Sequence, residues 1–502
     1  MAGKIDILPA TLSNIIKGQP FRVTVTVSGE TNISANTEID IVSSPGVHLI
    51  KKFPGTVVKT NFIQQMIFLA DDTDADYKIS FTAKSASSPK GSVDYKPVEN
   101  PELIPDSCVL RGSSSYLYDP SPVGLSGTPP TSSNPFILAS INPMGVSGGS
   151  ISKYDIQIRA TGPVRIFTVD DVEILPYEVD DQKQYYDYLV QKSTKLAVNL
   201  KIYATTGIAQ FVGFETIFSR RVYNQKQVMF ITSSPIAVSD DFDPPIIEET
   251  YQSSTLTRPD QPDYFHFMIP QNNHLHPGDF IIGFVTDDDK HIYKKNLIFG
   301  EVAVAEDGYF RFKVAYSDMY NGTNLISYAA LDQGGNLVGS ESNYISYDSG
   351  GNNNPSPNDQ SRTLDAPEVH DQFGLFIGIY QSINIHSIGN KGIEVWLPVA
   401  ATANDLNKIA EGDSITIKAY ISYCVDTETP ARPLPIVVTE NHIVQQKEID
   451  SGYYKHTIAA DKLLGYDTIQ GDFEGSISID YSRLAQNQKS QLFTRGFDTV
   501  AP

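Results

Sequence analysis

The chain has 502 residues, 40% of them hydrophobic, and a formal net charge of −21 at pH 7. This amount of apolar material excludes a globally disordered chain and is enough for about three to four domains of ordinary size. The negative charge excludes nucleic acid and anionic lipid as partners, because binding phosphate requires clustered Lys and Arg.

Cysteines and apolar runs restrict the cellular setting. The two cysteines, Cys108 and Cys424, exclude a disulfide framework, and two buried thiols are expected. Apolar runs stay shorter than the ~20 residues of a membrane helix, so no membrane insertion is expected. The N-terminus lacks the apolar segment of a secretory signal. We expect an extracellular or cell-surface protein without a Sec signal in this chain, and the alternative is a cytoplasmic one.

Residue types and periodicity favour strands. Val, Ile, Thr, Phe and Tyr are abundant, and short alternating runs recur between clusters of Gly, Pro, Asn, Asp and Ser. Segments with a helical period of 3.6 residues are hard to find. The sequence therefore predicts an all-β protein.

Residues 1–98 have the pattern of one β-sandwich. In the clearest run, Phe21, Val23, Val25 and Val27 alternate with polar residues and share one face of a strand. About seven short strands in about a hundred residues are typical of an immunoglobulin-like sandwich.

Residues 99–238 fit this pattern least well. From Gly112 to Ser150 the chain is rich in Ser, Pro and Gly, which predicts a long surface loop. Strand-like runs resume at Tyr154, and Gln182 to Lys192 is compatible with a short helix. We predict a β-domain of unsettled topology.

The strongest pattern is an internal repeat. Residues 276–285 and 410–421 each combine a Gly-Asp turn with a strand-like run of β-branched and aromatic residues. Their flanks match as well, with a proline-marked strand upstream and a Gly-Tyr step downstream. A repeat of β-sandwich size predicts tandem domains. The predicted division is a repeat at 240–348, a flexible linker at 349–362 and a second repeat at 363–502.

The same residue types recur at matching places in the two repeats. They are Pro245, Gly278, Asp279, Gly308 and Tyr309, then Pro367, Gly412, Asp413, Gly452 and Tyr453. With these residues the repeats resemble the tandem immunoglobulin-like domains of bacterial surface proteins and adhesins, the invasin/intimin-type group. The resemblance covers mainly residues 240–502, with residues 1–98 as a looser third member. It implies tandem immunoglobulin-like β-sandwiches in an elongated array, acting as non-enzymatic spacers or adhesive modules.

Acidic clusters are the candidates for a cofactor site. The cluster at residues 72–76 follows a predicted strand. Its alternating carboxylates are the hard oxygen ligands that calcium prefers. The other lies at a predicted domain junction, where a cation would stiffen the joint. The competing interpretation of each is a solvated acidic turn. The candidate calcium ligands are Asp72, Asp74, Asp76, Asp240, Asp241 and Asp243.

Tyrosines near the Ser/Pro/Gly-rich stretch are the candidates for ligand contact. Tyr116, Tyr118, Tyr185 and Tyr186 offer rigid amphipathic surface for a sugar or a protein partner. They fit equally well as half-buried sheet residues. No catalytic signature is found: residues 145–149 match G-x-S-x-G, but a strand rather than the required helix is expected to follow.

The sequence thus predicts a non-enzymatic structural or adhesive interaction protein at or outside the bacterial cell. Its partner is a protein or a glycan, or the chain itself as a homo-oligomer or filament. One alternative is a carbohydrate-binding protein or carbohydrate-active enzyme with its site in residues 99–238. Another is a structural component of a filament, a phage or a secretion apparatus.

Overall fold

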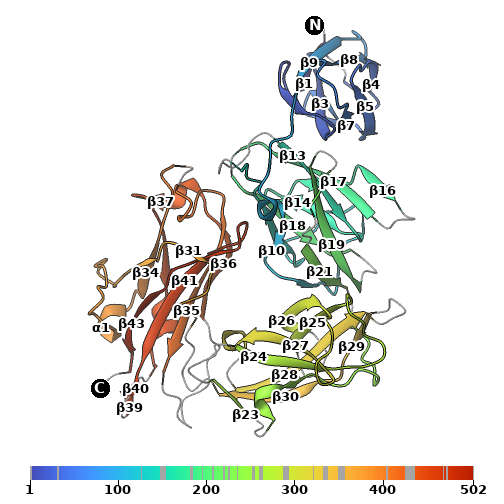
Figure 1. Cartoon of the computed structure of the whole chain (residues 1–502). Helices are drawn as coiled ribbons and strands as arrows, with labels where there is room; N and C mark the ends of the chain where they lie inside the picture. The colour runs from blue at the N-terminus through green and yellow to red at the C-terminus, as the bar shows by residue number, and fades with distance from the viewer. Residues whose placement is uncertain are drawn as a thin grey trace. The chain divides into compact units, whose positions relative to one another are not determined.

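A computed structural model gives the structure of the chain, whose regular secondary structure is almost entirely β-strand in the described residues (Figure 1). The prediction of an all-β fold is therefore confirmed. The described part excludes residues 1–2, 31–32, 126, 147–153, 181–184, 195, 206–208, 219–220, 224–226, 234–235, 252–254, 259–263, 287–292, 320–321, 332–336, 349–354, 356, 403–404, 424–435, 467–468, 471–472 and 501–502.

The chain forms two compact units. The first comprises Met1–Leu110, Ile141–Leu200 and Val212–Val228, and the second comprises Arg111–Ser140, Lys201–Phe211 and Met229–Pro502. Residues 99–238 contribute to both units. The predicted division into four domains stays a prediction.

The N-terminal part of the first unit consists of two sheets. Its strands are β1 (Lys4–Leu8), β2 (Asn14–Ile16), β3 (Pro20–Ser28), β4 (Glu38–Ser43), β5 (Val47–Lys52), β6 (Thr56–Val58), β7 (Asn61–Ala70), β8 (Tyr77–Lys84) and β9 (Lys90–Val98). One sheet has the order β1-β3-β7-β5, with β6 also on β7, and the other has the order β2-β9-β8-β4. These are the A-B-E-D and G-F-C orders of an immunoglobulin-like sandwich, with β2 added parallel to β9.

Burial in β3 follows the predicted alternation. Phe21, Val23, Val25 and Val27 are buried, and the residues between them are half-buried. They pack in one core with side chains of β7 and β8, among them Phe81. The prediction for this strand is confirmed.

The rest of the first unit is also built from strands. They include β13 (Tyr154–Ala160), β14 (Arg165–Thr168), β15 (Glu173–Ile174), β16 (Glu178–Asp180), β17 (Tyr185–Lys192) and β20 (Arg221–Val222), with parts of β18 (Val198–Tyr203) and β19 (Ala209–Phe218), after the 3₁₀ turn η1 (Pro105–Cys108). β13 pairs antiparallel with both β17 and β19. The helix considered for residues 182–192 is wrong, because residues 185–192 form β17. Asp187–Val190 are buried at four consecutive positions. The sequence therefore shows neither the two-residue alternation of a half-buried strand nor the 3.6-residue period of a helix.

The Ser/Pro/Gly-rich stretch is not one continuous loop. It contains β10 (Arg111–Gly112), β11 (Tyr116–Tyr118) and β12 (Ile137–Ile141), and β11 runs parallel to β21 (Gln227–Thr232). The prediction of a single loop from Gly112 to Ser150 is therefore wrong in part. Every residue of β12 is buried, so this strand shows no alternation by which the sequence identifies it.

Within the second unit, residues 240–348 form two sheets. Their strands are β22 (Ile246–Ile247), β23 (Thr255–Thr257), β24 (Tyr264–Pro270), β25 (Phe280–Thr286), β26 (Tyr293–Glu301), β27 (Tyr309–Ala315), β28 (Gly322–Leu331), β29 (Leu337–Gly339) and β30 (Asn343–Asp348), with 3₁₀ turns η2 (Glu248–Thr250) and η3 (Tyr316–Asp318). One sheet has the order β22-β24-β27, and the other has β23-β30-β28-β25-β26, with β29 on β28. These orders correspond to strands A-B-E and G-F-C of an immunoglobulin-like sandwich.

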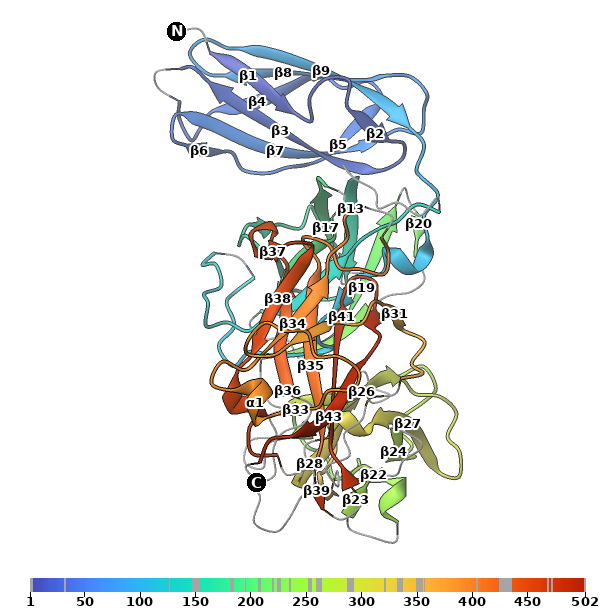
Figure 2. The same ribbon diagram turned by 90° about the vertical axis from the view of Figure 1, so that its left-hand side faces the viewer.

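Residues 359–500, here called the C-terminal module, repeat this plan (orange to red in Figure 2). Their elements are β31 (Arg362–Leu364), β32 (Glu368–His370), β33 (Ile383–Asn384), α1 (Ile385–Ile388), β34 (Ile393–Pro398), β35 (Ser414–Ser422), β36 (Ile436–Ile443), η4 (Gln446–Glu448), β37 (Ile449–Asp450), β38 (Tyr453–Ile458), α2 (Ala460–Leu463), β39 (Ile469–Gln470), β40 (Phe473–Glu474), β41 (Ser476–Arg483), β42 (Gln488–Ser490) and β43 (Phe493–Asp498). One sheet has the order β32-β34-β38-β37, and the other has β31-β42-β41-β35-β36, with β43 on β41.

The repeated Gly-Asp turn has the same structure in both copies. Gly278 and Gly412 have φ angles of 96° and 84°, a region that favours glycine. In each copy the aspartate carboxylate accepts a backbone hydrogen bond from the residue three positions earlier. The turn leads into β25 in one copy and into β35 in the other, so the two segments are structural equivalents. The matching bonds are His276 N to Asp279 Oδ2 (2.9 Å) and Ala410 N to Asp413 Oδ2 (2.8 Å), then Gly278 N to Val302 O (2.9 Å) and Gly412 N to Val444 O (2.8 Å).

Candidate functional site

The first acidic cluster lies in the loop between β7 and β8. Asp74 accepts a hydrogen bond from Lys17 and Asp76 accepts one from Lys96. The bond and charge of Lys17 lower the pKa of Asp74. Within the described part of the chain, no group of three or more His, Cys, Asp or Glu is placed to hold a metal ion. Calcium binding by Asp72, Asp74 and Asp76 stays a prediction.

The second acidic cluster lies just before β22. Asp240, Asp241 and Asp243 are exposed, whereas Phe242 between them is buried against the ring of Tyr328. The apolar contact of Phe242 therefore anchors this turn. The role of the three carboxylates as calcium ligands also stays a prediction.

The four tyrosines lie on two strands, in different units. Tyr116 and Tyr118 belong to β11, and Tyr116 packs against Phe230 and Phe284 with ring centroids 5.8 and 5.0 Å apart. Tyr185 and Tyr186 belong to β17. The guanidinium of Arg159 lies 4.0 Å from the ring centroid of Tyr185, and the Tyr185 hydroxyl donates to Glu178 at 3.2 Å. All four are half-buried, and their role in ligand contact stays a prediction.

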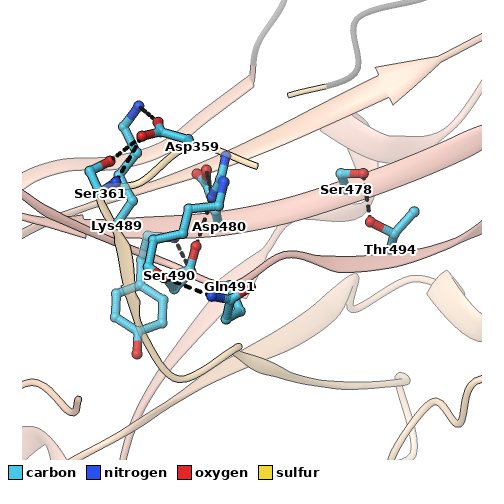
Figure 3. Close-up of polar contacts among 10 residues, drawn as sticks. Asp359, Ser361, Ser478, Asp480, Lys489, Ser490, Gln491 and Thr494 are labelled. Carbon is cyan, nitrogen blue, oxygen red and sulfur yellow. Dashed lines mark hydrogen bonds and ion pairs between the residues drawn. The ribbon is translucent and has the colours of Figure 1, made fainter. Parts of the chain in front are cut away.

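A buried polar network occupies the C-terminal module (Figure 3). Arg362 Nη1 donates to Asp480 Oδ2 at 2.9 Å and to the Ser490 carbonyl at 2.7 Å. Burial raises the pKa of Asp480, and the charge of Arg362 opposes that rise. At the edge of the network, Lys489 Nζ lies 2.7 Å from Asp359 Oδ2. These contacts fasten β31 to β41 and β42, which is a structural role.

The first unit contains a cavity of about 860 Å³. Its lining includes Leu12, Ile15, Phe21, Asp155 and Lys192. Burial raises the pKa of Asp155 to about 6 and lowers the pKa of Lys192 to about 8. Volumes of 300–1,000 Å³ are usual for small-molecule sites, so this cavity has the size of a small-ligand site. Part of its lining comes from residues 99–238, where the alternative carbohydrate site is predicted.

Among the described residues of the C-terminal module, the most exposed large apolar side chains lie between β32 and β33. We call residues 371–382 the apolar loop. Among them only Ile377 is buried in the module core. Five other large side chains face solvent. Large apolar residues are seldom so exposed next to one another. They are Phe373 (61%), Leu375 (65%), Phe376 (51%), Ile379 (70%) and Tyr380 (96%).

Polar contacts bind the backbone of the apolar loop to the module. Asp371 Oδ1 accepts the backbone N–H groups of Phe373 and Leu375, both at 2.9 Å. Arg495 Nε donates to the Gly378 carbonyl at 2.7 Å. Gln381 Oε1 accepts the Gly378 N–H at 2.6 Å. The backbone of the loop is thus bound to the module while its apolar side chains point outward.

The apolar loop is not among the sites predicted from the sequence, although the sequence contains a signal for it. From Gln372 to Asn390 the chain has no Asp, Glu, Lys or Arg, in a protein of which 19% of residues are charged. An uncharged apolar run is ordinarily assigned to a buried strand. Only the structure shows that Arg495 and Asp371 form hydrogen bonds with the loop backbone, while the apolar side chains of the loop are exposed to solvent.

No helix in the described part of the chain combines the length and the apolar character needed to cross a bilayer.

Comparisons with known proteins give similarity of fold only. No protein-family model and no curated protein matches the chain. Among solved structures, domains 4–9 of the surface-layer protein SbsC are 10% identical with a TM-score of 0.18, over 99% of this chain and 65% of that one. InvD of Yersinia pseudotuberculosis is 11% identical with a TM-score of 0.16, over 69% and 98%. The tandem Ig repeats of Dlar are 8% identical with a TM-score of 0.20, over 45% and 97%. These values place the chain in none of those families.

Proposed function

We propose that the chain is a non-enzymatic structural and adhesive protein that acts at or outside the bacterial cell. Its immunoglobulin-like sandwiches serve as spacers, and loops at their ends make the contacts. The observation that carries the proposal is the apolar loop, an exposed apolar surface whose backbone is hydrogen-bonded to a folded module.

The size of the apolar loop supports a role in binding. Side chains of this kind have surfaces of about 150–250 Å² each, so the five exposed ones leave on the order of 600 Å² of apolar surface in water. Burying that area contributes about 15 kcal/mol at ~25 cal/mol per Å². Association costs about 4–15 kcal/mol. The two magnitudes are comparable, so contacts at the loop are able to support binding on their own or with modest help.

A triple loop variant tests this proposal. The full chain and its F373D/I379D/Y380D variant are compared for binding to a glycan array with and without calcium, to neutral phosphatidylcholine vesicles and to immobilised copies of the chain. We expect the wild type to bind at least one probe and the variant to lose that binding. Equal binding by both proteins to every probe would overturn the proposal.

The same experiment separates the carbohydrate alternative. Glycan binding that survives in the triple loop variant but is lost in Lys192→Met, a substitution in the cavity of the first unit, would favour a carbohydrate-binding protein. Loss of binding in the triple variant alone supports adhesion through the loop.

A further inference from the structure

We infer that the apolar loop docks against the same loop of a second copy of this chain, across a two-fold axis. The inference rests on the proposed function, because it takes the loop as a contact surface and names its occupant. A two-fold contact brings the same surface patch from both chains together, so no separate complementary surface is needed.

The area of the loop matches the requirement of a small homodimer. With on the order of 600 Å² of apolar surface on each chain, a two-fold contact buries about 1,200 Å² in total. This lies at the lower limit of about 1,200–2,000 Å² for stable, specific interfaces. Neighbouring backbone and polar atoms at the rim add to the contact. The loop is therefore large enough for self-association.

Charge favours self-association through an uncharged surface such as this one. Two chains that each carry a net charge of −21 repel one another. The five exposed apolar side chains of the loop lie in the stretch from Gln372 to Asn390, which has no Asp, Glu, Lys or Arg. Two charged residues contact the loop backbone, since Asp371 accepts backbone hydrogen bonds of the loop and Arg495 donates to its carbonyl groups. Two copies that meet here therefore bring uncharged side chains together at the tip of the loop.

The rigidity of the loop lowers the cost of docking. Gly374 has a φ angle of 79°, which permits the tight turn that starts the loop. The Ile377 N–H donates to the Val369 carbonyl at 2.9 Å, and the Asp371 N–H donates to the Leu375 carbonyl at 2.9 Å. Because the backbone is fixed in the free chain, little conformational entropy is lost on association.

Sedimentation velocity of the full chain over a range of concentrations tests the inference. We expect a monomer–dimer equilibrium that persists at 1 M NaCl, because an apolar contact is not screened by salt. Tyr380→Asp places a carboxylate in the contact and weakens dimerisation at least tenfold. Tyr251→Asp is the matched control, since Tyr251 is 90% exposed and lies outside the apolar loop; it leaves the dimer unchanged. Equal melting temperatures for the two variants exclude unfolding as the cause.

A cysteine pair tests the two-fold axis. Tyr380→Cys forms a disulfide-linked dimer on mild oxidation, because a two-fold contact places this residue near its own copy, and Tyr251→Cys does not. A wild-type chain that stays monomeric at all concentrations overturns the inference. If that monomer binds phosphatidylcholine vesicles or glycans through the loop, the proposed function stands and only self-docking fails. If the monomer binds no probe in a loop-dependent manner, both fail.

Discussion

Arg362 and Asp480 form an ion pair that is almost completely excluded from water, with 3% and 6% of their side chains exposed. Taking two charges out of water is costly, and their attraction offsets that cost only when both remain and their other hydrogen bonds are satisfied. Here Arg362 also donates to the Ser490 carbonyl. The pair therefore makes the C-terminal module sensitive to the loss of either partner.

We expect Arg362→Met to destabilise the C-terminal module by about 3–5 kcal/mol, because it leaves the Asp480 carboxylate buried without a partner. Trp396 is the single tryptophan of the chain and lies in this module. Urea unfolding followed by its fluorescence therefore reports on the C-terminal module within the full chain.

Two further variants test the cause of that effect. Lys489→Met breaks the more exposed Lys489–Asp359 pair and is expected to cost about 0–1 kcal/mol. The double variant R362M/D480L removes both buried charges and is expected to recover most of the loss. A double variant as unstable as Arg362→Met would contradict this account.

Lys192 makes the first unit sensitive to alkaline pH. Its side chain is 1% exposed and its amine donates to Asn142 Oδ1 at 3.0 Å. Burial lowers its pKa from 10.5 to about 8. Between pH 8 and 10.5 the unfolded chain therefore binds more protons at this residue than the folded one, and the free energy of unfolding rises with pH.

We expect this rise to amount to about 3 kcal/mol, at ~1.4 kcal/mol per pH unit of pKa difference. Below pH 8 the destabilising contribution of Lys192 is fully present, and above pH 10.5 it is absent. Calorimetry of the wild type and Lys192→Met from pH 7 to 10.5 measures it as the difference between their two stability curves. Lys391→Met, at an exposed lysine, is the control. Parallel curves for wild type and Lys192→Met would refute the prediction.

At the scale of elements, glycines with positive φ mark where strands begin and end. Gly452 precedes β38 with a φ angle of 84°, and Gly392 precedes β34 with a φ angle of 90°. A Cβ atom at Gly452 would meet nothing within 4 Å, whereas one at Gly392 would lie 1.9 Å from the Ile458 carbonyl oxygen at the end of β38. The two glycines share a backbone conformation but not a packing environment.

This contrast predicts different costs for the same substitution. Gly452→Ala is expected to cost about 1–2 kcal/mol, the strain of a left-handed conformation alone. Gly392→Ala adds a clash with the backbone of β38 and is expected to cost more than 3 kcal/mol, since β34 and β38 must separate. Urea unfolding followed by Trp396 fluorescence compares both variants. Equal losses would show that the contact with Ile458 is unimportant.

Strands were predictable from the sequence where only one face of the strand is buried, or where a turn residue directly precedes the strand. β3 alternates from Phe21 to Val27, and β25 and β35 follow the Gly-Asp turns at Gly278 and Gly412. β12 was not predictable as a strand with an assigned face, because all its residues are buried and no period appears. The exposure of Tyr380 was not predictable either, since it depends on hydrogen bonds from Arg495, far away in the sequence.

At the scale of the whole chain, the C-terminal module has a hydrophobic core of its own. The buried core residues grouped there all lie between Leu364 and Phe497. Its first anchored residue is Asp359, held by Lys489, and Arg362 follows in β31. The hydrophobic core is thus complete between Leu364 and Phe497. The ion pairs of Asp359 and Arg362 add the residues just before it to the folded module.

We expect a fragment of residues 357–502 to fold alone and to unfold in one cooperative transition. A fragment of residues 366–502 lacks β31 and Arg362, so Asp480 loses its partner and the fragment is less stable by about 3 kcal/mol or more. Circular dichroism and Trp396 fluorescence during urea unfolding compare the two. A shorter fragment as stable as the longer one would show that β31 is dispensable.

In the apolar loop, the groups that hold the backbone are different from the side chains exposed at the tip. Arg495 and Asp371 hold only backbone atoms of the loop, and neither of these bonds depends on which side chains stand at positions 373, 375, 379 and 380. The exposed side chains can thus be exchanged while the backbone of the loop stays bound to the module, as in a hypervariable loop of an antibody. Other side chains can therefore be placed at these positions without refolding the domain beneath them.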